Sequence, residues 1–117
     1  ACTNAFGVVM VVAMDDLPLA SSARVLVQVG MPCRPTGWAC RPTTITPEGG
    51  TAVEGWRVTN YGKAPWAVEV PRVQVRLRNA GLTRATILDM NGMPVDNLAL
   101  RDGGFDFPPD AMYVVLQ

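Results

Sequence analysis

The fold is indicated most clearly by the stretch PRVQVRLRN, residues 71–79. Val73, Val75 and Leu77 alternate there with Gln74 and three arginines. Alternation of this kind predicts a β-strand with one apolar face and one solvated face. An apolar strand face must be covered by a second layer, so the pattern predicts packed sheets.

Several other segments have strand composition and are bounded by turn residues. We expect strands at Gly7–Met14, Ala23–Gly30, Arg84–Met90, Met93–Leu100, Phe105–Phe107 and Met112–Leu116, and two more within Trp56–Val70. Gly7–Met14 is apolar on both faces, which predicts a central strand or one covered on both sides. Asn91-Gly92 predicts a two-residue hairpin turn in which both residues have positive φ. Met31–Gly50 contains four prolines and is predicted to be a long irregular loop.

No segment shows sustained helical periodicity. We therefore predict an all-β fold without a long helix: an antiparallel β-sandwich of jelly-roll or Ig-like type with about eight strands. The chain has 117 residues, 49% hydrophobic and 17% charged, which fits one packed domain over residues 1–117. It begins at Ala1 without a signal-like segment, so we interpret it as a segment of a longer protein.

Charge and composition argue against several classes of function. The formal net charge is zero, so no global field attracts nucleic acid or an anionic membrane surface, and neither is an expected partner. There is no histidine, which removes the commonest general base and metal ligand. Most of the acidic residues lie in predicted turns, where turn formation explains them. We expect no enzyme activity in the domain itself, no cofactor and no metal site.

The three cysteines, Cys2, Cys33 and Cys40, leave two alternatives open. They are free thiols, or Cys33 and Cys40 form a disulfide across a loop that contains Gly37. Three cysteines without histidine do not provide the four ligands of a zinc site.

Four aromatic residues are the candidate ligand-binding groups: Trp38, Trp56, Tyr61 and Trp66. Exposed Trp and Tyr rings can stack on the C–H faces of sugar rings. The alternative is that these rings cap the core or pack against a neighbouring domain. Exposure decides between the two.

Two segments, Asp15–Gln28 and Ala85–Leu116, carry a family resemblance. The first runs DDLPLASSARVLVQ, and the second combines Asn91-Gly92 with a closing strand that follows Pro108-Pro109. In this order they resemble the C-terminal β-sandwich of multidomain bacterial glycoside hydrolases. The resemblance implies a secreted protein, extracellular or periplasmic, in which this domain packs on a separate catalytic domain. No catalytic residue of that family maps onto the chain.

Three functional hypotheses follow. The leading one is a non-catalytic accessory domain whose partner is the catalytic domain of a glycoside hydrolase-like protein. The second is a carbohydrate-binding module that holds polysaccharide through its exposed aromatic rings. The third is a structural module that forms a homo-oligomer through an uncovered sheet face.

Overall fold

The computed structural model describes all 117 residues and contains strands and turns without any helix. This confirms the all-β prediction. There are eleven strands: β1 (Val8–Ala13), β2 (Val25–Gly30), β3 (Cys33–Thr36), β4 (Ala39–Ile45), β5 (Val53–Asn60), β6 (Lys63–Val68), β7 (Gln74–Arg76), β8 (Arg84–Leu88), β9 (Pro94–Ala99), β10 (Gly104–Asp106) and β11 (Tyr113–Leu116). The structure therefore contains no candidate for a membrane-spanning helix.

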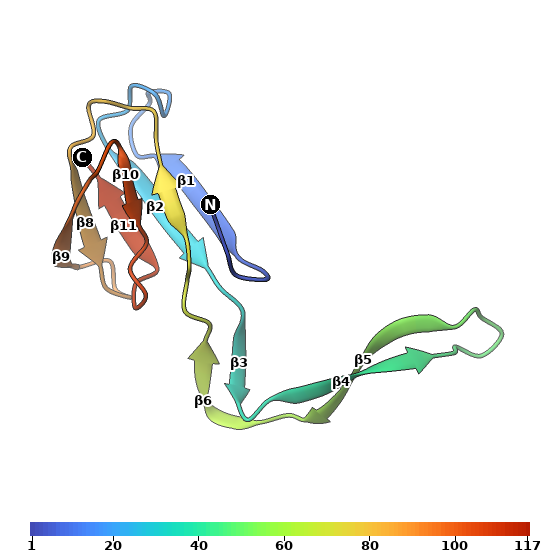
Figure 1. The fold of residues 1–117 in the computed structure, drawn as a ribbon. Coiled ribbons are helices and arrows are strands. Elements are labelled where there is room, and N and C mark those ends of the chain that lie inside the picture. The colour runs from blue at the N-terminus through green and yellow to red at the C-terminus, as the bar shows by residue number, and fades with distance from the viewer. The chain divides into compact units, whose positions relative to one another are not determined.

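The chain divides into two compact units. One unit, here called the body, consists of residues 1–32 and 70–117. The other, here called the ribbon, consists of residues 33–69. Figure 1 shows the strands of each unit.

The body is a β-sandwich-like pair of layers. Five strands form one antiparallel sheet in the order β1-β2-β11-β8-β9. β7 and β10 pair with each other and lie over one face of that sheet, in front of it in Figure 1. The N-terminal residue is tied to this second layer, because the main-chain N–H of Gln74 donates to the carbonyl of Ala1 at 2.8 Å.

The core lies between these two layers. β2 places Val25, Val27 and Val29 on the covered face, where they are 0%, 0% and 1% exposed. Register brings Val114 and Leu116 of β11 onto the same face, because directly opposed residues in an antiparallel pair point to the same side. The second layer contributes Val73, Val75, Phe105 and Phe107. The alternation in residues 71–79 is therefore confirmed, although the regular strand there is only β7.

The two hairpin turns of the C-terminal part differ in backbone geometry. Only Asp102 and Gly103 have positive φ at both central positions, 50° and 71°, as a primed two-residue turn requires. At Asn91-Gly92 only Gly92 has positive φ, and its N–H donates to the carbonyl of Asp89 at 3.0 Å. The prediction of a primed Asn-Gly turn was wrong. The N–H of Asp89 donates to the carbonyl of Met93 at 2.8 Å, so the loop is one residue longer, and the register of the β8–β9 pair shifts between Ile87 and Leu88.

β1 is also placed differently from the expectation. It is an edge strand paired only with β2. Val8, Val9, Met10 and Val12 are between 40% and 55% exposed. The prediction that Gly7–Met14 is central or covered on both sides was wrong for the chain alone. An apolar run does not itself encode which neighbours a strand acquires.

The ribbon is one long hairpin built from two strand pairs. β3 pairs with β6, and β4 pairs with β5, both antiparallel. The prediction of an irregular loop over Met31–Gly50 was wrong, because Pro35 and Pro42 lie within strands. Both strands of a two-stranded pair are edge strands, which is where prolines are tolerated. The two strands expected within Trp56–Val70 are present as β5 and β6.

A corner separates the two strand pairs of the ribbon. The N–H of Trp38 donates to the carbonyl of Pro35 at 3.0 Å, and the N–H of Gly62 donates to Asn60 Oδ1 at 2.9 Å. Gly62 has φ +70°, and a Cβ there would lie 2.8 Å from the carbonyl oxygen of Thr36. Only glycine therefore fits this corner.

Replacement of Leu116 by Ala tests the position of the core. Leu116 is 1% exposed, so Leu116→Ala should lower the free energy of unfolding by about 2–5 kcal/mol. Val95→Ala, at a side chain 62% exposed, is the control and should change it by less than about 0.5 kcal/mol. Urea denaturation measures both. Equal effects of the two substitutions would contradict the placement of the core.

Acidification tests the β8–β9 loop. Asp89 Oδ1 accepts the N–H groups of Met93 and Asn91, both at 2.8 Å. The Met93 bond, followed by those from Asn91, holds the pKa of Asp89 below its usual value. The ionised Asp89 carboxylate therefore stabilises the folded state fully above its unfolded pKa of about 3.9. This contribution is lost as pH falls through the lower pKa of Asp89 in the folded state. The free energy of unfolding, measured by urea denaturation, should fall less between neutral and acidic pH in Asp89→Asn than in the wild type. Asp110→Asn is the control, and an equal change in it would argue against the loop contact.

The corner of the ribbon is tested by two glycine substitutions. Gly62→Ala should open the corner, at a cost of roughly 1–3 kcal/mol for the strained backbone alone. Gly49→Ala is the matched control, because Gly49 has φ +71° but a Cβ added there would meet no atom within 4 Å. The indole resonance of Trp38 should shift in Gly62→Ala and stay unchanged in Gly49→Ala. No shift in either variant would show that the corner is not closed around Gly62.

Candidate functional site

The ribbon carries all four aromatic residues that the sequence singles out. Trp38 lies at the corner between β3 and β4, Trp56 on β5, Tyr61 between β5 and β6, and Trp66 on β6. None of the residues 33–69 is buried. Trp56, Tyr61 and Trp66 are 68%, 73% and 64% exposed. They are therefore surface groups of this chain and do not cap its core.

The structure brings only two of these rings together. Trp38 and Tyr61 contact each other edge to face, with ring centroids 6.0 Å apart and planes at 84°. The guanidinium carbon of Arg34 lies 5.2 Å from the centroid of the Trp38 ring, as a cation–π contact. Perpendicular rings do not form a flat platform, and Arg34 occupies one face of Trp38. Trp56 and Trp66 keep their exposed rings without such contacts.

Trp56 lies beside polar groups on one face of the β4–β5 pair. It is opposite Pro42, and Glu54 is opposite Thr44, so these four side chains share a face. Pro42, Thr44, Glu54 and Trp56 line an open hollow together with Thr43 and Gly55. An exposed indole beside a carboxylate and hydroxyl groups can combine stacking with hydrogen bonding. We call Pro42, Thr44, Glu54 and Trp56 the Trp56 face.

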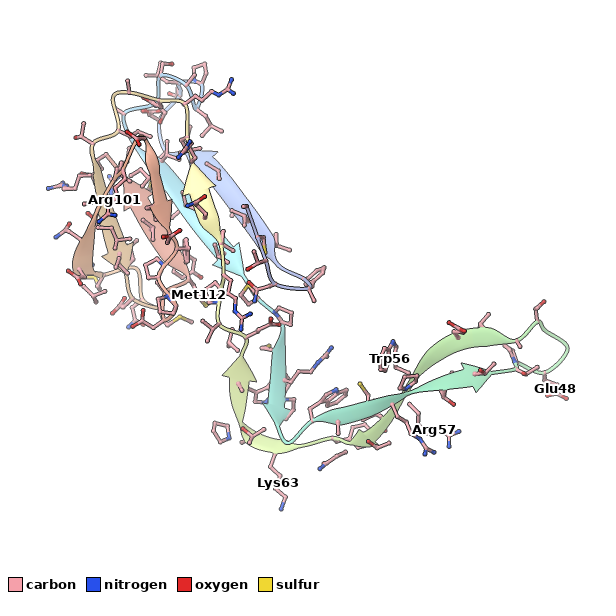
Figure 2. The ribbon with its side chains drawn as sticks, in the orientation of Figure 1. Glu48, Trp56, Arg57, Lys63, Arg101 and Met112 are labelled. Atoms are coloured by element: carbon pink, nitrogen blue, oxygen red, sulfur yellow. The ribbon has the colours of Figure 1, made fainter.

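The opposite face of the same strand pair is cationic. Arg41 and Arg57 are directly opposed across the two strands, and both are exposed. Figure 2 shows Trp56 and Arg57 on opposite sides of the ribbon. Like charges at directly opposed positions destabilise a strand pair. This face therefore adds no cohesion to the ribbon on its own.

The cysteines are three exposed free thiols in the structure. Cys33 begins β3 opposite Val68, whereas Cys40 lies on β4 opposite Val58, beyond the corner. The structure therefore has free thiols at Cys33 and Cys40 and no disulfide between them. No group of three or more His, Cys, Asp or Glu side chains is arranged to hold a metal ion.

A second exposed surface lies on the body. The face of the five-stranded sheet that points away from β7 and β10 is lined by apolar side chains from several strands. An open hollow of about 510 Å³ on this face is bordered by residues that include Met14, Leu26, Leu88, Met90, Tyr113 and Val115. We call it the outer face. Sequence patterns did not reveal it, because its residues come from distant segments that only the strand order brings together.

Comparison of the chain with family models, with curated proteins and with solved structures found no match.

Proposed function

We propose that this chain is a non-catalytic accessory domain whose ribbon docks on a larger protein. The observation that carries the proposal is the complete lack of buried residues in the ribbon. An isolated two-stranded hairpin is marginally stable in water, because it has too little apolar burial to offset the ordering of its backbone. A partner surface that covers its aromatic side chains would supply the missing burial.

The composition of the ribbon favours a protein partner. Exposed tryptophan and tyrosine are typical of residues that contribute most to protein–protein association. Ile45 and Val53, directly opposed near the tip, are 48% and 53% exposed and lie on the face of Arg41 and Arg57, so both faces of the β4–β5 pair carry exposed apolar side chains. In keeping with the resemblance of Asp15–Gln28 and Ala85–Leu116, the proposed partner is the catalytic domain of a glycoside hydrolase-like protein. The resemblance is also the basis for proposing a secreted protein.

The Trp56 face favours a second function, carbohydrate binding. Its exposed indole lies beside Thr44 and Glu54, which can accept or donate hydrogen bonds to sugar hydroxyls. Trp38 and Tyr61 contribute less to this function, because they are engaged with each other edge to face. In this alternative Trp56 is the main sugar-stacking residue, and Trp66 is an independent second one.

The docking proposal is tested with the catalytic domain encoded beside this segment in the full reading frame. Binding of that domain to the chain is measured by calorimetry, for wild type and for Trp56→Ala and Trp66→Ala. Truncation of a central aromatic residue in an interface costs about 2 kcal/mol or more, so at least one variant should bind about thirtyfold more weakly. Met93→Ala, at a body side chain that is 61% exposed, is the matched control and should bind as wild type.

Three outcomes would count against the docking proposal. They are a reading frame without a catalytic domain, no binding in trans, or equal affinity of all variants. Hydrolysis of glycosides by the chain alone would contradict its non-catalytic character. Retention on polysaccharide affinity gels that is lost in Trp56→Ala, with no binding to the catalytic domain, would favour the carbohydrate-binding alternative.

A further inference from the structure

The free edge of β1 lacks the features that normally protect an exposed strand. Residues 8–14 contain no charged residue, proline or glycine. Natural edge strands are usually interrupted by lysine, proline or a bulge, or are covered, because unpaired main-chain groups template further pairing. β1 pairs with β2 over all six of its residues without a register shift. It therefore presents a regular apolar edge.

The hydrogen-bond phase of β1 follows from its neighbours. The N–H of Met14 donates to the carbonyl of Arg24 at 2.8 Å, which extends the β1–β2 register by one pair. Hydrogen-bonded and non-hydrogen-bonded pairs alternate along an antiparallel ladder. The main-chain groups of Met10 and Val12 therefore point towards β2, and those of Val9, Val11 and Ala13 point outwards to the free edge.

The other edge of β2 supports this assignment. The N–H of Val29 donates to the carbonyl of Met112 at 3.0 Å, so the odd-numbered residues of β2 face β11. Its even-numbered residues must then face β1. Leu26 and Gln28 are opposite Val12 and Met10, in agreement with the phase derived from Met14.

The outward-pointing groups of β1 match those of a second β1. In an antiparallel pair centred on Val11, Val11 is opposite Val11 of the second copy and Val9 is opposite its Ala13. Each of these residues can then exchange both of its main-chain hydrogen bonds with its counterpart. Side chains stay on their own faces, so Met10 is opposite Val12 of the second copy on the outer face.

Charge also allows a second copy at this edge. In the register centred on Val11, Asp15 falls opposite Gly7 of the second copy, so no two carboxylates are directly opposed. The formal net charge of the chain is zero, so two copies do not repel each other as whole bodies. A strand from a strongly charged partner would bring charges beside Val8, Met10 and Val12, which offer them no counter-ion.

We propose that the chain forms a twofold symmetric homodimer through antiparallel pairing of β1 with β1 of a second copy, centred on Val11. The pairing joins the two five-stranded sheets into one continuous sheet. It covers the unpaired edge and part of the exposed surface of Val9 and Met10. Isologous pairing of this kind closes on itself, so it ends at the dimer and does not propagate into fibres.

Sedimentation of the full chain over a wide concentration range tests the dimer, and amide hydrogen exchange tests its interface. We expect a reversible monomer–dimer equilibrium. The amides of Val9, Val11 and Ala13 should exchange fast at low concentration and become protected as dimer forms. The amides of Met10 and Val12 should be protected at both concentrations, because β2 accepts their hydrogen bonds.

Two variants localise the interface. Val11→Pro removes an outward N–H and leaves the β1–β2 ladder intact, and proline is tolerated at such edge positions. Met10→Lys places a cation beside the dyad on a side chain that is 46% exposed. Each should weaken dimerisation at least tenfold while circular dichroism stays unchanged. Met90→Lys, on a side chain that is 70% exposed in the β8–β9 loop, is the matched control and should dimerise as wild type.

The proposal is overturned by a chain that stays monomeric at high concentration. It is equally overturned by a dimer whose Val9, Val11 and Ala13 amides keep exchanging fast, or by one that Met90→Lys dissociates as strongly as Met10→Lys. The second result would exclude the β1 edge as the contact, and the third would place the contact on the outer face of the sheet.

Discussion

The side-chain alternation of β2 is the constraint on which the rest of the body depends. Val25, Val27 and Val29 are fully buried, and β2 is hydrogen-bonded on one edge to β1 and on the other to β11. A shift of one residue in either ladder would turn these valines to the outer face and remove the centre of the core. The covering layer of β7 and β10 is built on this register, since Val75 and Phe105 pack into the same cluster.

The same constraint explains why so much apolar surface remains exposed. Only one face of the sheet packs against the core, and β1 is hydrogen-bonded to β2 on one side only. The outer face and the free edge of β1 are thus left over once the core is complete. The ribbon differs from the body, because its strands pair in a defined register but none of its residues is buried. Both features leave large apolar side chains exposed, among them Trp66 and Met10, and they are the basis for the proposed docking and dimerisation.

Sequence reasoning identified most strands of the body but not their neighbours. Alternation around Val75 is a local signal, and the structure agrees with it. The edge position of β1 and the outer face depend on strand order, which no local pattern encodes. The strands around Pro35 were missed because proline in a two-stranded pair looks the same as proline in a loop. A buried polar contact was also missed: Asn79 Nδ2 donates to the carbonyls of Leu19 and Ser22, both at 2.8 Å.

The candidate ligand-binding residues were identified as a group, but their arrangement required coordinates. Composition pointed to four aromatic residues, and only the fold separates Trp56 and Trp66, which are exposed without a ring contact, from the Trp38–Tyr61 pair. Residue-resolved amide exchange of the chain alone, at low concentration, tests whether the body is stable by itself and the ribbon is not. We expect slow exchange in β2, β8 and β11 and fast exchange throughout residues 33–69. Exchange in the ribbon as slow as in β2 would contradict it, because the ribbon would then be stable without a partner.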